Sequence, residues 1–269
     1  MNTIVLTGSQ SGMGLVMRQY LASQPDHQII GVDLPGKGAE VEADLSTPDG
    51  VRAAVQGVLA QAQSGINGII ANAGVDLNQP ALTLGVNYFG VVDFLTALQP
   101  TLAAAAPAAA VVNASNSVMI TPNIPMEPVD ALLRGDRDHA VALLKDQPQY
   151  SYQVSKFAIA RWIRRHAATT TWAGSGIRMN AVCPGPVMTP LLEHDLQDPV
   201  KGPRIEQLPR PLGAFTTCEQ VAYLVEFLLS DRARFLVGQL IMIDGGIETT
   251  FRPDDYPTVW SIPPKGGAS

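Results

Sequence analysis

Tyr152 and Lys156 form a Tyr-x-x-x-Lys pair at the start of a segment with helical periodicity, residues 151–173. A separation of four residues places both side chains on one face of a helix. A phenol with an ordinary pKa of about 10 is a weak base at neutral pH, and lowering that pKa by about three units takes roughly 4 kcal/mol of preferential phenolate stabilisation. A neighbouring ammonium favours the phenolate, so the pair predicts proton transfer at a substrate oxygen. Because such pairs also occur by chance, this prediction depends on the rest of the chain.

Three glycines, Gly8, Gly12 and Gly14, stand between an apolar stretch at 3–6 and a helix-period segment at 15–21. Without side chains, the backbone can approach a phosphate closely, and the N–H groups and positive dipole end of the following helix stabilise its charge. Glycine turns without any ligand are also common. The passage from strand through glycines to helix therefore predicts a dinucleotide site that needs support from the next strand.

Asp33 gives that support, because it ends a second apolar stretch, 28–32, at about the spacing of 20 residues expected beyond the glycines. Its carboxylate can accept hydrogen bonds from the adenosine ribose hydroxyls and would repel a 2′-phosphate. Residues 34–36 offer no guanidinium for such a phosphate, and Lys37 is interpreted as a solvated loop charge. NAD is therefore the expected cofactor rather than NADP. Lys156 would then hold the nicotinamide ribose, and the positive charge of the oxidised ring would further favour the Tyr152 phenolate.

Apolar stretches of strand length recur along the chain, mostly separated by segments with helical periodicity. We expect strands at 3–6, 28–32, 68–71, 109–112, 177–182 and 240–243, and helices at 15–21, 48–63, 84–105, 151–173 and 218–229. This alternation predicts an α/β fold, a Rossmann-type doubly wound parallel sheet flanked by helices, formed by residues 1–269 as a single domain. Such sheets bind ligands at the carboxyl ends of their strands, where most of the chemical motifs fall.

Two regions depart from this alternation. The insertion at about 116–149 contains four prolines and two short helical candidates, 129–134 and 137–145. Connections longer than about 12–15 residues are uncommon unless functional, so it is interpreted as a lid over the site, a cover for a surface used elsewhere in oligomers, or a tolerated surface insertion. The C-terminal tail, 248–269, either reaches a neighbour or the pocket or is disordered.

Composition narrows the class of protein. The chain is 46% hydrophobic, 16% charged and carries a net charge of −6, which fits one large core and argues against nucleic-acid or anionic-membrane binding. The longest apolar run, 102–112, is interrupted by Pro107 and is shorter than the roughly 20 residues of a membrane span. Cys183 and Cys218 show no disulfide framework or metal-ligand spacing, so no metal is expected. A short strand follows Met1 directly, without the regions of a signal peptide, and a cytoplasmic protein is expected.

The motifs occur in an order that resembles the short-chain dehydrogenase/reductase family, over residues 1 to about 247. The resemblance implies that Asn87 anchors a proton-relay water through its helix, that Asp44 binds adenine and that Thr189 binds the nicotinamide carboxamide. It also implies that Asn72 lines the cofactor. Three of these residues have a structural alternative: Asn72 bridges strands, Asp44 caps a turn, or Asn87 satisfies a break in its helix. The cofactor-binding residues implied are Gly8, Ser11, Gly12, Met13, Gly14, Asp33, Asp44, Leu45, Asn72, Ala73, Gly74, Tyr152, Lys156, Pro184, Gly185, Val187 and Thr189.

The catalytic serine is less clearly marked than the Tyr–Lys pair. In the family's usual Asn-x-Ser-Ser pattern the second serine is catalytic, but here the corresponding stretch, 113–117, places Asn116 at that position. A shift of one residue makes Ser115 the match, and Ser117 points the same way if the strand continues. We expect Ser115 to act and keep Ser117 as the alternative. The catalytic residues expected are Ser115, Tyr152, Lys156 and Asn87.

Within that family, the stretches 27–33, 43–47, 86–90, 189–192 and 197–199, with the long insertion, resemble the bacterial 3α-hydroxysteroid dehydrogenase/carbonyl reductase branch. This implies oxidoreduction between NAD and a secondary alcohol or ketone, with a bulky apolar ring compound as substrate. Apolar residues of the variable segments would line the substrate site: Met119, Met188, Leu191 and Leu192, together with Ile120, Ile124 and Met126. The alternatives are a broad-specificity reductase of xenobiotic ketones and a non-catalytic NAD-sensing protein. A homodimer or homotetramer is expected.

Overall fold

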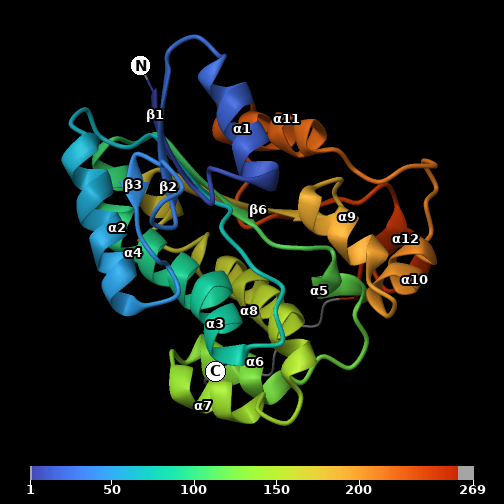
Figure 1. Ribbon diagram of the computed structural model, residues 1–269. Coiled ribbons are helices and arrows are strands. Elements are labelled where there is room, and N and C mark those ends of the chain that lie inside the picture. The colour runs from blue at the N-terminus through green and yellow to red at the C-terminus, as the bar shows by residue number, and fades with distance from the viewer. Residues whose placement is uncertain (1, 260–269) are drawn as a thin grey trace.

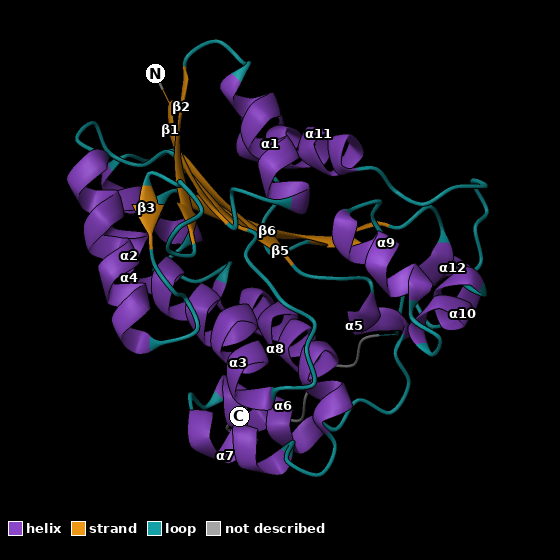
Figure 2. Cartoon of the chain, viewed as in Figure 1, coloured by secondary structure: helices purple, strands orange, loops and turns teal. Residues whose placement is uncertain are grey.

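A parallel sheet of seven strands runs through the computed structural model, which describes residues 2–259 (Figures 1 and 2). Its order is β3-β2-β1-β4-β5-β6-β7. The strands are β1 Asn2–Thr7, β2 His27–Asp33, β3 Val41–Glu42, β4 Gly68–Ala71, β5 Ala108–Asn113, β6 Ile177–Pro184 and β7 Leu240–Ile243. The chain order reverses between β1 and β4, which is where doubly wound sheets bind ligands. The predicted fold is confirmed, and each predicted strand is present.

Helices cover both faces of this sheet (Figure 1). On one face α1 (Gly12–Ala22) and α11 (Cys218–Leu229) pack together and bury Met17, Leu21 and Val225 against Leu6 and Ile70 of the strands. On the other face lie α2 (Pro48–Gln61), α4 (Gly90–Ala104) and α8 (Ser151–His166). Every residue of β4, β5 and β6 is buried, as expected for parallel strands covered on both sides.

The remaining helices are short and lie between the larger elements. They are α3 Pro80–Leu84, a π-helical turn Gly85–Phe89, α5 Ser117–Ile120, α6 Met126–Leu133, α7 Arg137–Leu143, α9 Pro190–Gln197, α10 Lys201–Glu206 and α12 Ile247–Phe251. Single 3₁₀ turns occupy Pro148–Tyr150, Ala173–Ser175 and Asp231–Ala233. Sequence periodicity did not predict the two-residue β3 or helices α5, α9, α10 and α12, because each is too short to show a period.

Two predicted helix boundaries were wrong. The helix expected at 151–173 ends at His166, where the Thr169 hydroxyl donates to the His166 carbonyl at 2.7 Å. The chain then turns back, and the ring of Trp172 packs edge-on against Trp162 with 5.9 Å between centroids. Hydroxyl side chains compete for backbone groups and favour such an ending. The helix expected at 84–105 begins earlier, at Pro80, a residue favoured in the first helical turn.

The insertion at 116–149 is not a loose surface segment, because one apolar face of it packs against the core. Its two predicted helices are present at slightly different bounds, as α6 and α7. Val129, Leu132, Ala140 and Leu144 are buried, and α6 packs against α8. Its first turn, α5, borders the cavity described below.

The C-terminal tail begins as a helix, because α12 runs to Phe251 and residues 252–259 follow it in an irregular course. Residues 260–269 of the predicted tail lie outside the described residues. One helical stretch in the described part, Pro80–Ala104, is long and apolar enough by composition to cross a membrane. It is mostly buried, and Phe94, Leu95 and Leu98 of this stretch belong to the core of the sheet.

Candidate active site

The turn from β1 into α1 is formed by glycines that no other residue could replace without strain. Gly8 and Gly12 have φ angles of +66° and +50°. A Cβ at Gly14 would stand 1.8 Å from the Gly8 carbonyl oxygen, and one at Gly8 would stand 3.0 Å from the Ala73 Cα. The Ser11 side chain does not cap α1. The N-terminus of α1 therefore keeps its backbone donors for a ligand, as a phosphate cradle requires.

Asp33 lies at the rim of this cradle. Its carboxylate accepts hydrogen bonds from the backbone N–H groups of Gln10 and Leu34, both at 2.8 Å. The side chain thus holds the glycine turn against the end of β2, and its charge stands where a ribose hydroxyl would bind. On these observations the residues present fit a dinucleotide.

Asn72 bridges three strands, which was one of its two expected roles. Its amide donates to the carbonyls of Thr7 and Gly8 at 3.2 and 3.3 Å, and its Oδ1 accepts from the Asn113 amide at 3.0 Å. It also lines the cavity described next, together with Gly74. Asn72 therefore ties the glycine turn to β4 and β5 while bordering the place where a cofactor would lie.

Asp44 and Leu45 lie between β3 and α2. The Asp44 carboxylate accepts from the Ser46 N–H at 2.9 Å, which is the turn-capping alternative, and Leu45 is buried. A methyl group added at Gly90 would stand 2.6 Å from the Leu45 carbonyl oxygen, so α4 is pressed against this turn. Adenine binding by Asp44 stays a prediction.

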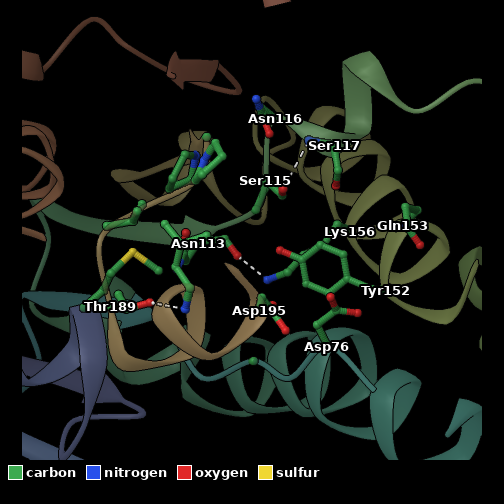
Figure 3. Close-up of a pocket in the computed structure, with 18 of the residues that line it drawn as sticks. Asp76, Asn113, Ser115, Asn116, Ser117, Tyr152, Gln153, Lys156, Thr189 and Asp195 are labelled. Carbon is green, nitrogen blue, oxygen red and sulfur yellow. Dashed lines mark hydrogen bonds between the residues drawn. The ribbon is translucent and has the colours of Figure 1, made fainter. Parts of the chain in front are cut away.

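A cavity of about 400 Å³ opens at the carboxyl ends of β4, β5 and β6 (Figure 3). It brings together residues that are far apart in the sequence, and Tyr152 and Lys156 both face it. The expected site residues among its lining are Met13, Asn72, Gly74, Ser115, Tyr152, Lys156, Pro184, Gly185, Val187, Thr189 and Leu192. The predicted catalytic residues other than Asn87 thus line one space with most of the predicted nicotinamide-side residues.

Lys156 is almost completely buried, with 4% of its surface exposed. Its ammonium donates to the Asn113 carbonyl at 2.7 Å, and it stands 5.7 Å from the centre of the Tyr152 ring (Figure 3). Burial lowers its pKa to about 8. The ammonium is therefore held by the end of β5, beside the phenol and facing the cavity.

The net effect of the protein's own groups is to raise the Tyr152 pKa, the opposite of the direction that pairing with Lys156 favours. Burial raises it to about 12, the Ser115 hydroxyl lowers it by hydrogen bonding, and the negative charge of Asp76 raises it. Burial has the largest effect because a phenolate loses hydration there. The phenol is thus held protonated, ready to act as an acid, and its use as a base needs a further positive charge nearby.

The stretch 115–117 contains both candidates for the catalytic serine, Ser115 and Ser117. Ser115 is buried on the cavity wall, and its Oγ accepts from the Ser117 N–H at 3.1 Å (Figure 3). Asn116 instead donates its amide to the Asp244 carboxylate at 3.2 Å. Ser117 also lines the cavity, and its buried Oγ has no partner among the described residues. The Ser115 hydroxyl lowers the Tyr152 pKa, which favours Ser115 as the predicted catalytic serine and leaves Ser117 as the alternative.

Asn87 lies in the π-helical turn Gly85–Phe89 between α3 and α4. Its Oδ1 accepts from the Val75 N–H and its amide donates to the Val75 carbonyl, both at 2.8 Å, and also to the Ser155 hydroxyl at 3.1 Å. A methyl group added at Gly74 would stand 3.3 Å from the Asn87 Oδ1 and 3.4 Å from the Lys156 ammonium. Asn87 therefore fixes the segment after β4 next to Lys156, and its relay role stays a prediction.

Thr189 caps α9, because its hydroxyl accepts from the Leu192 N–H at 3.2 Å, and it borders the same cavity. Gly185 is needed for close packing, since a Cβ there would stand 2.8 Å from that of Asp244. Asp244 accepts from the backbone of Gly246 and Glu248. It therefore ends β7 as a turn.

The expected substrate residues had mixed outcomes. Leu192 and Ile120 line the cavity. Met119 does not: it lies one residue before Ile120, and its carbonyl is bound by Arg252. Met188 was also wrong, because it is 42% exposed and lies outside the cavity. The Leu191 side chain lies outside the described part of the chain.

Several lining residues were missed from the sequence. Asp76 and Asp195 both border the cavity and share the Lys201 ammonium, at 3.3 and 3.2 Å. Ile205 and Leu208, from α10 and the loop after it, complete the apolar wall. The four lie on short or irregular segments, so only a tertiary structure brings them to the site. No group of three potential metal ligands occurs within residues 2–259.

Known proteins resemble this chain along nearly its whole length. A family model described as enoyl-(acyl carrier protein) reductase matches residues 139–248. A 3-alpha-hydroxysteroid dehydrogenase/carbonyl reductase of Comamonas testosteroni is 34% identical over 264 residues, which cover 95% of this chain and 100% of that protein. The chain belongs to the short-chain dehydrogenase/reductase family. The predicted membership is confirmed.

Two further relatives bear on function. A coniferyl-alcohol dehydrogenase of Pseudomonas sp. strain HR199 is 29% identical, over 92% of this chain and 97% of its own. The crystal structure of the 3-alpha-hydroxysteroid dehydrogenase from Pseudomonas sp. B-0831, complexed with NADH, superimposes with a TM-score of 0.88 and 35% identity. It covers 94% of this chain and 99% of that one. The Comamonas protein and these two relatives are each named as dehydrogenases.

Proposed function

We propose that this protein catalyses reversible hydride transfer between NAD(H) and a secondary alcohol or ketone. The observation that carries the proposal is the meeting of Ser115, Tyr152 and Lys156 at one cavity, beside a glycine turn shaped for a dinucleotide. The NADH complex of the hydroxysteroid dehydrogenase relative supports the choice of cofactor. The carboxylate of Asp33 supports NAD over NADP, because it would repel a 2′-phosphate.

The cofactor would lie from the glycine turn to the cavity. Gly8, Gly12 and Gly14 would hold the pyrophosphate, Asp33 the adenosine ribose, and Lys156 and Thr189 the nicotinamide end. When bound, NAD supplies the hydride acceptor for the alcohol and a positive charge near the phenol of Tyr152. That charge would offset the effect of burial, which holds the Tyr152 pKa at about 12.

Each polar group of the cavity then has a task. Tyr152 takes the hydroxyl proton of the alcohol, or returns it to the ketone oxygen in the reverse direction. Ser115 donates a hydrogen bond to the substrate oxygen and stabilises the charge that develops there. The Lys156 ammonium stabilises the phenolate, and Asn87, held beside Lys156, positions the route by which the proton returns to solvent.

The substrate would be a bulky apolar ring compound, such as a hydroxysteroid or an alicyclic or aromatic ketone. Ile120, Leu192, Ile205 and Leu208 supply an apolar wall, and relatives named for steroid and coniferyl-alcohol oxidation support this class. Broad reduction of xenobiotic ketones is the second candidate, and the carbonyl reductase in the name of the Comamonas protein favours it.

An NAD-coupled screen of steroid and non-steroid secondary alcohols tests the proposal. We expect turnover of several ring alcohols, and comparison of kcat/KM across the panel separates a steroid specialist from a broad reductase. Tyr152→Phe should lower kcat by more than about a hundredfold, as loss of a general acid–base group does, and leave NADH binding by fluorescence unchanged. Near-normal turnover of this variant would refute the role of Tyr152. Tight NADH binding by the wild type without any turnover would instead indicate an NAD-sensing protein.

A further inference from the structure

The segment that follows β7 reaches back to the catalytic serine through a chain of buried hydrogen bonds. Asp244 is 8% exposed, and its carboxylate accepts from the N–H groups of Gly246 and Glu248 at 3.0 and 2.9 Å. The same carboxylate accepts from the side-chain amide of Asn116, which is 5% exposed. The residue after Ser115 is therefore fixed to the start of α12.

A second contact joins the other end of α12 to the same wall. The Arg252 guanidinium donates to the Met119 carbonyl at 2.9 Å, next to Ile120 of the cavity. The carboxylates of Asp255 and Glu248 form ion pairs with this guanidinium, at 3.0 and 3.9 Å. In Figure 1, α12 lies beside α5, and the two helices pack together. The turn 116–120 is thus held at its first residue by Asn116 and near its last by Arg252.

We infer that Asn116 and Arg252 are positioning residues for Ser115. This inference rests on the proposed function, since it gives the C-terminal segment a part in the same reaction. The Ser115 hydroxyl is already engaged by the Ser117 N–H, so its direction depends on where α5 begins. Holding both ends of α5 fixes that direction and the apolar wall at Ile120 together. A displacement of about 1 Å at a reacting group can cost a hundredfold in rate.

The contacts of Asn116 explain why an asparagine stands where the family's Asn-x-Ser-Ser pattern has its second serine. An amide can donate to the Asp244 carboxylate while its backbone N–H donates to the Pro184 carbonyl at 2.9 Å. Asn116 therefore joins β6, β7 and α5 at the point where Ser115 emerges. Asn116 borders the same cavity, but its side-chain amide is engaged by the Asp244 carboxylate, so the proposed effect of this side chain is exerted through Ser115.

The test is a double-mutant cycle with Ser115. Arg252→Ala and Asn116→Ala should each lower kcat about tenfold or more, with less than a twofold change in the Kd of NADH. In a Ser115→Ala background the same substitutions should change kcat by less than twofold, because the group they position is gone. Arg252→Lys, which keeps a donor for the Met119 carbonyl, should restore part of the rate. Arg234→Ala, at an exposed arginine after α11, is the matched control and should leave kcat unchanged.

The outcomes separate this inference from the proposed function. If the wild type shows no turnover of any alcohol, the proposed function fails. If it is active and the two substitutions leave kcat unchanged, or lower it equally with and without Ser115, the positioning role is overturned. A melting temperature measured for each variant shows whether it folds, and Arg252→Lys keeps the test usable should Asn116→Ala not fold.

Discussion

At the scale of single residues, the site depends on positions that have no room for a larger side chain. Gly14 is the clearest, because a Cβ there would stand 1.8 Å from the Gly8 carbonyl oxygen. Lys156 matters for a different reason, because its buried ammonium donates to the Asn113 carbonyl at the end of a buried strand. Both residues were predicted from their types and spacing, because these chemical needs leave a mark in local sequence.

Gly14→Ala should lower affinity for NADH at least about tenfold, since the glycine turn must move to relieve the contact. Gly174→Ala is the matched control, because its nearest neighbour would be the Thr170 Cβ at an ordinary 3.4 Å. Titration of NADH fluorescence with both variants checks this. Equal affinities would show that the turn from β1 into α1 does not form the cradle.

Other residues carried no readable signal. Met119 and Met188 look as suitable for a substrate site as Leu192, but their side chains are placed by turns whose course the sequence does not reveal. Asp76 and Asp195 lie on segments that are distant in the sequence and meet at Lys201 only in the folded chain. The direction of the Tyr152 pKa was also missed, because burial is a property of the whole fold and not of the Tyr–Lys spacing.

At the scale of elements, strands and helices with a continuous apolar pattern were predicted well, and short helices were not. Strands β4 and β7 and helix α11 have the expected bounds, since their apolar residues are buried in the core or pack against it. Helix α8 ends early at His166 because the threonines after it turn the chain. Helices α9 and α10, which carry Leu192 and Ile205 to the cavity, are too short to show periodicity.

The ion pairs of Lys201 join α9 and α10 to the segment after β4 across the cavity. Lys201→Ala should lower kcat/KM about two- to fivefold, because partly exposed ion pairs contribute up to about 1 kcal/mol. The wild type should approach the variant at high ionic strength, where such pairs are screened. Steady-state kinetics at low and high salt measure this, with the exposed Lys145→Ala as control. A salt dependence identical in both would argue against a bridge across the cavity.

At the scale of the whole molecule, the sheet brings the carboxyl ends of its strands together around the site. Burying a charged group there costs folding free energy, and this cost makes the stability of the protein depend on pH. The Lys156 pKa is about 8 in the folded protein against about 10.5 for an ordinary lysine. Between these values the unfolded chain binds more protons than the folded one, so stability rises with pH. Below pH 8 the buried ammonium costs the folded state about 3 kcal/mol, which is relieved as pH rises.

Thermal unfolding of the wild type and of Lys156→Met from pH 7 to 10 tests this linkage. We expect the melting temperature of the wild type to rise relative to that of the variant across this window. Above pH 10 the raised pKa of Tyr152 acts in the opposite direction, so the comparison ends there. Parallel curves would mean that Lys156 is not a buried, charged group.

The central claim is that hydrogen leaves an alcohol carbon for NAD while Tyr152 takes the hydroxyl proton. The most direct measurement uses a ring alcohol that is turned over in the screen and carries deuterium on its carbinol carbon. Mass spectrometry of the reduced cofactor should show one deuterium with the wild type and almost no reduced cofactor with Tyr152→Phe. Reduced cofactor without deuterium, or equal deuterium transfer by the variant, would contradict the account.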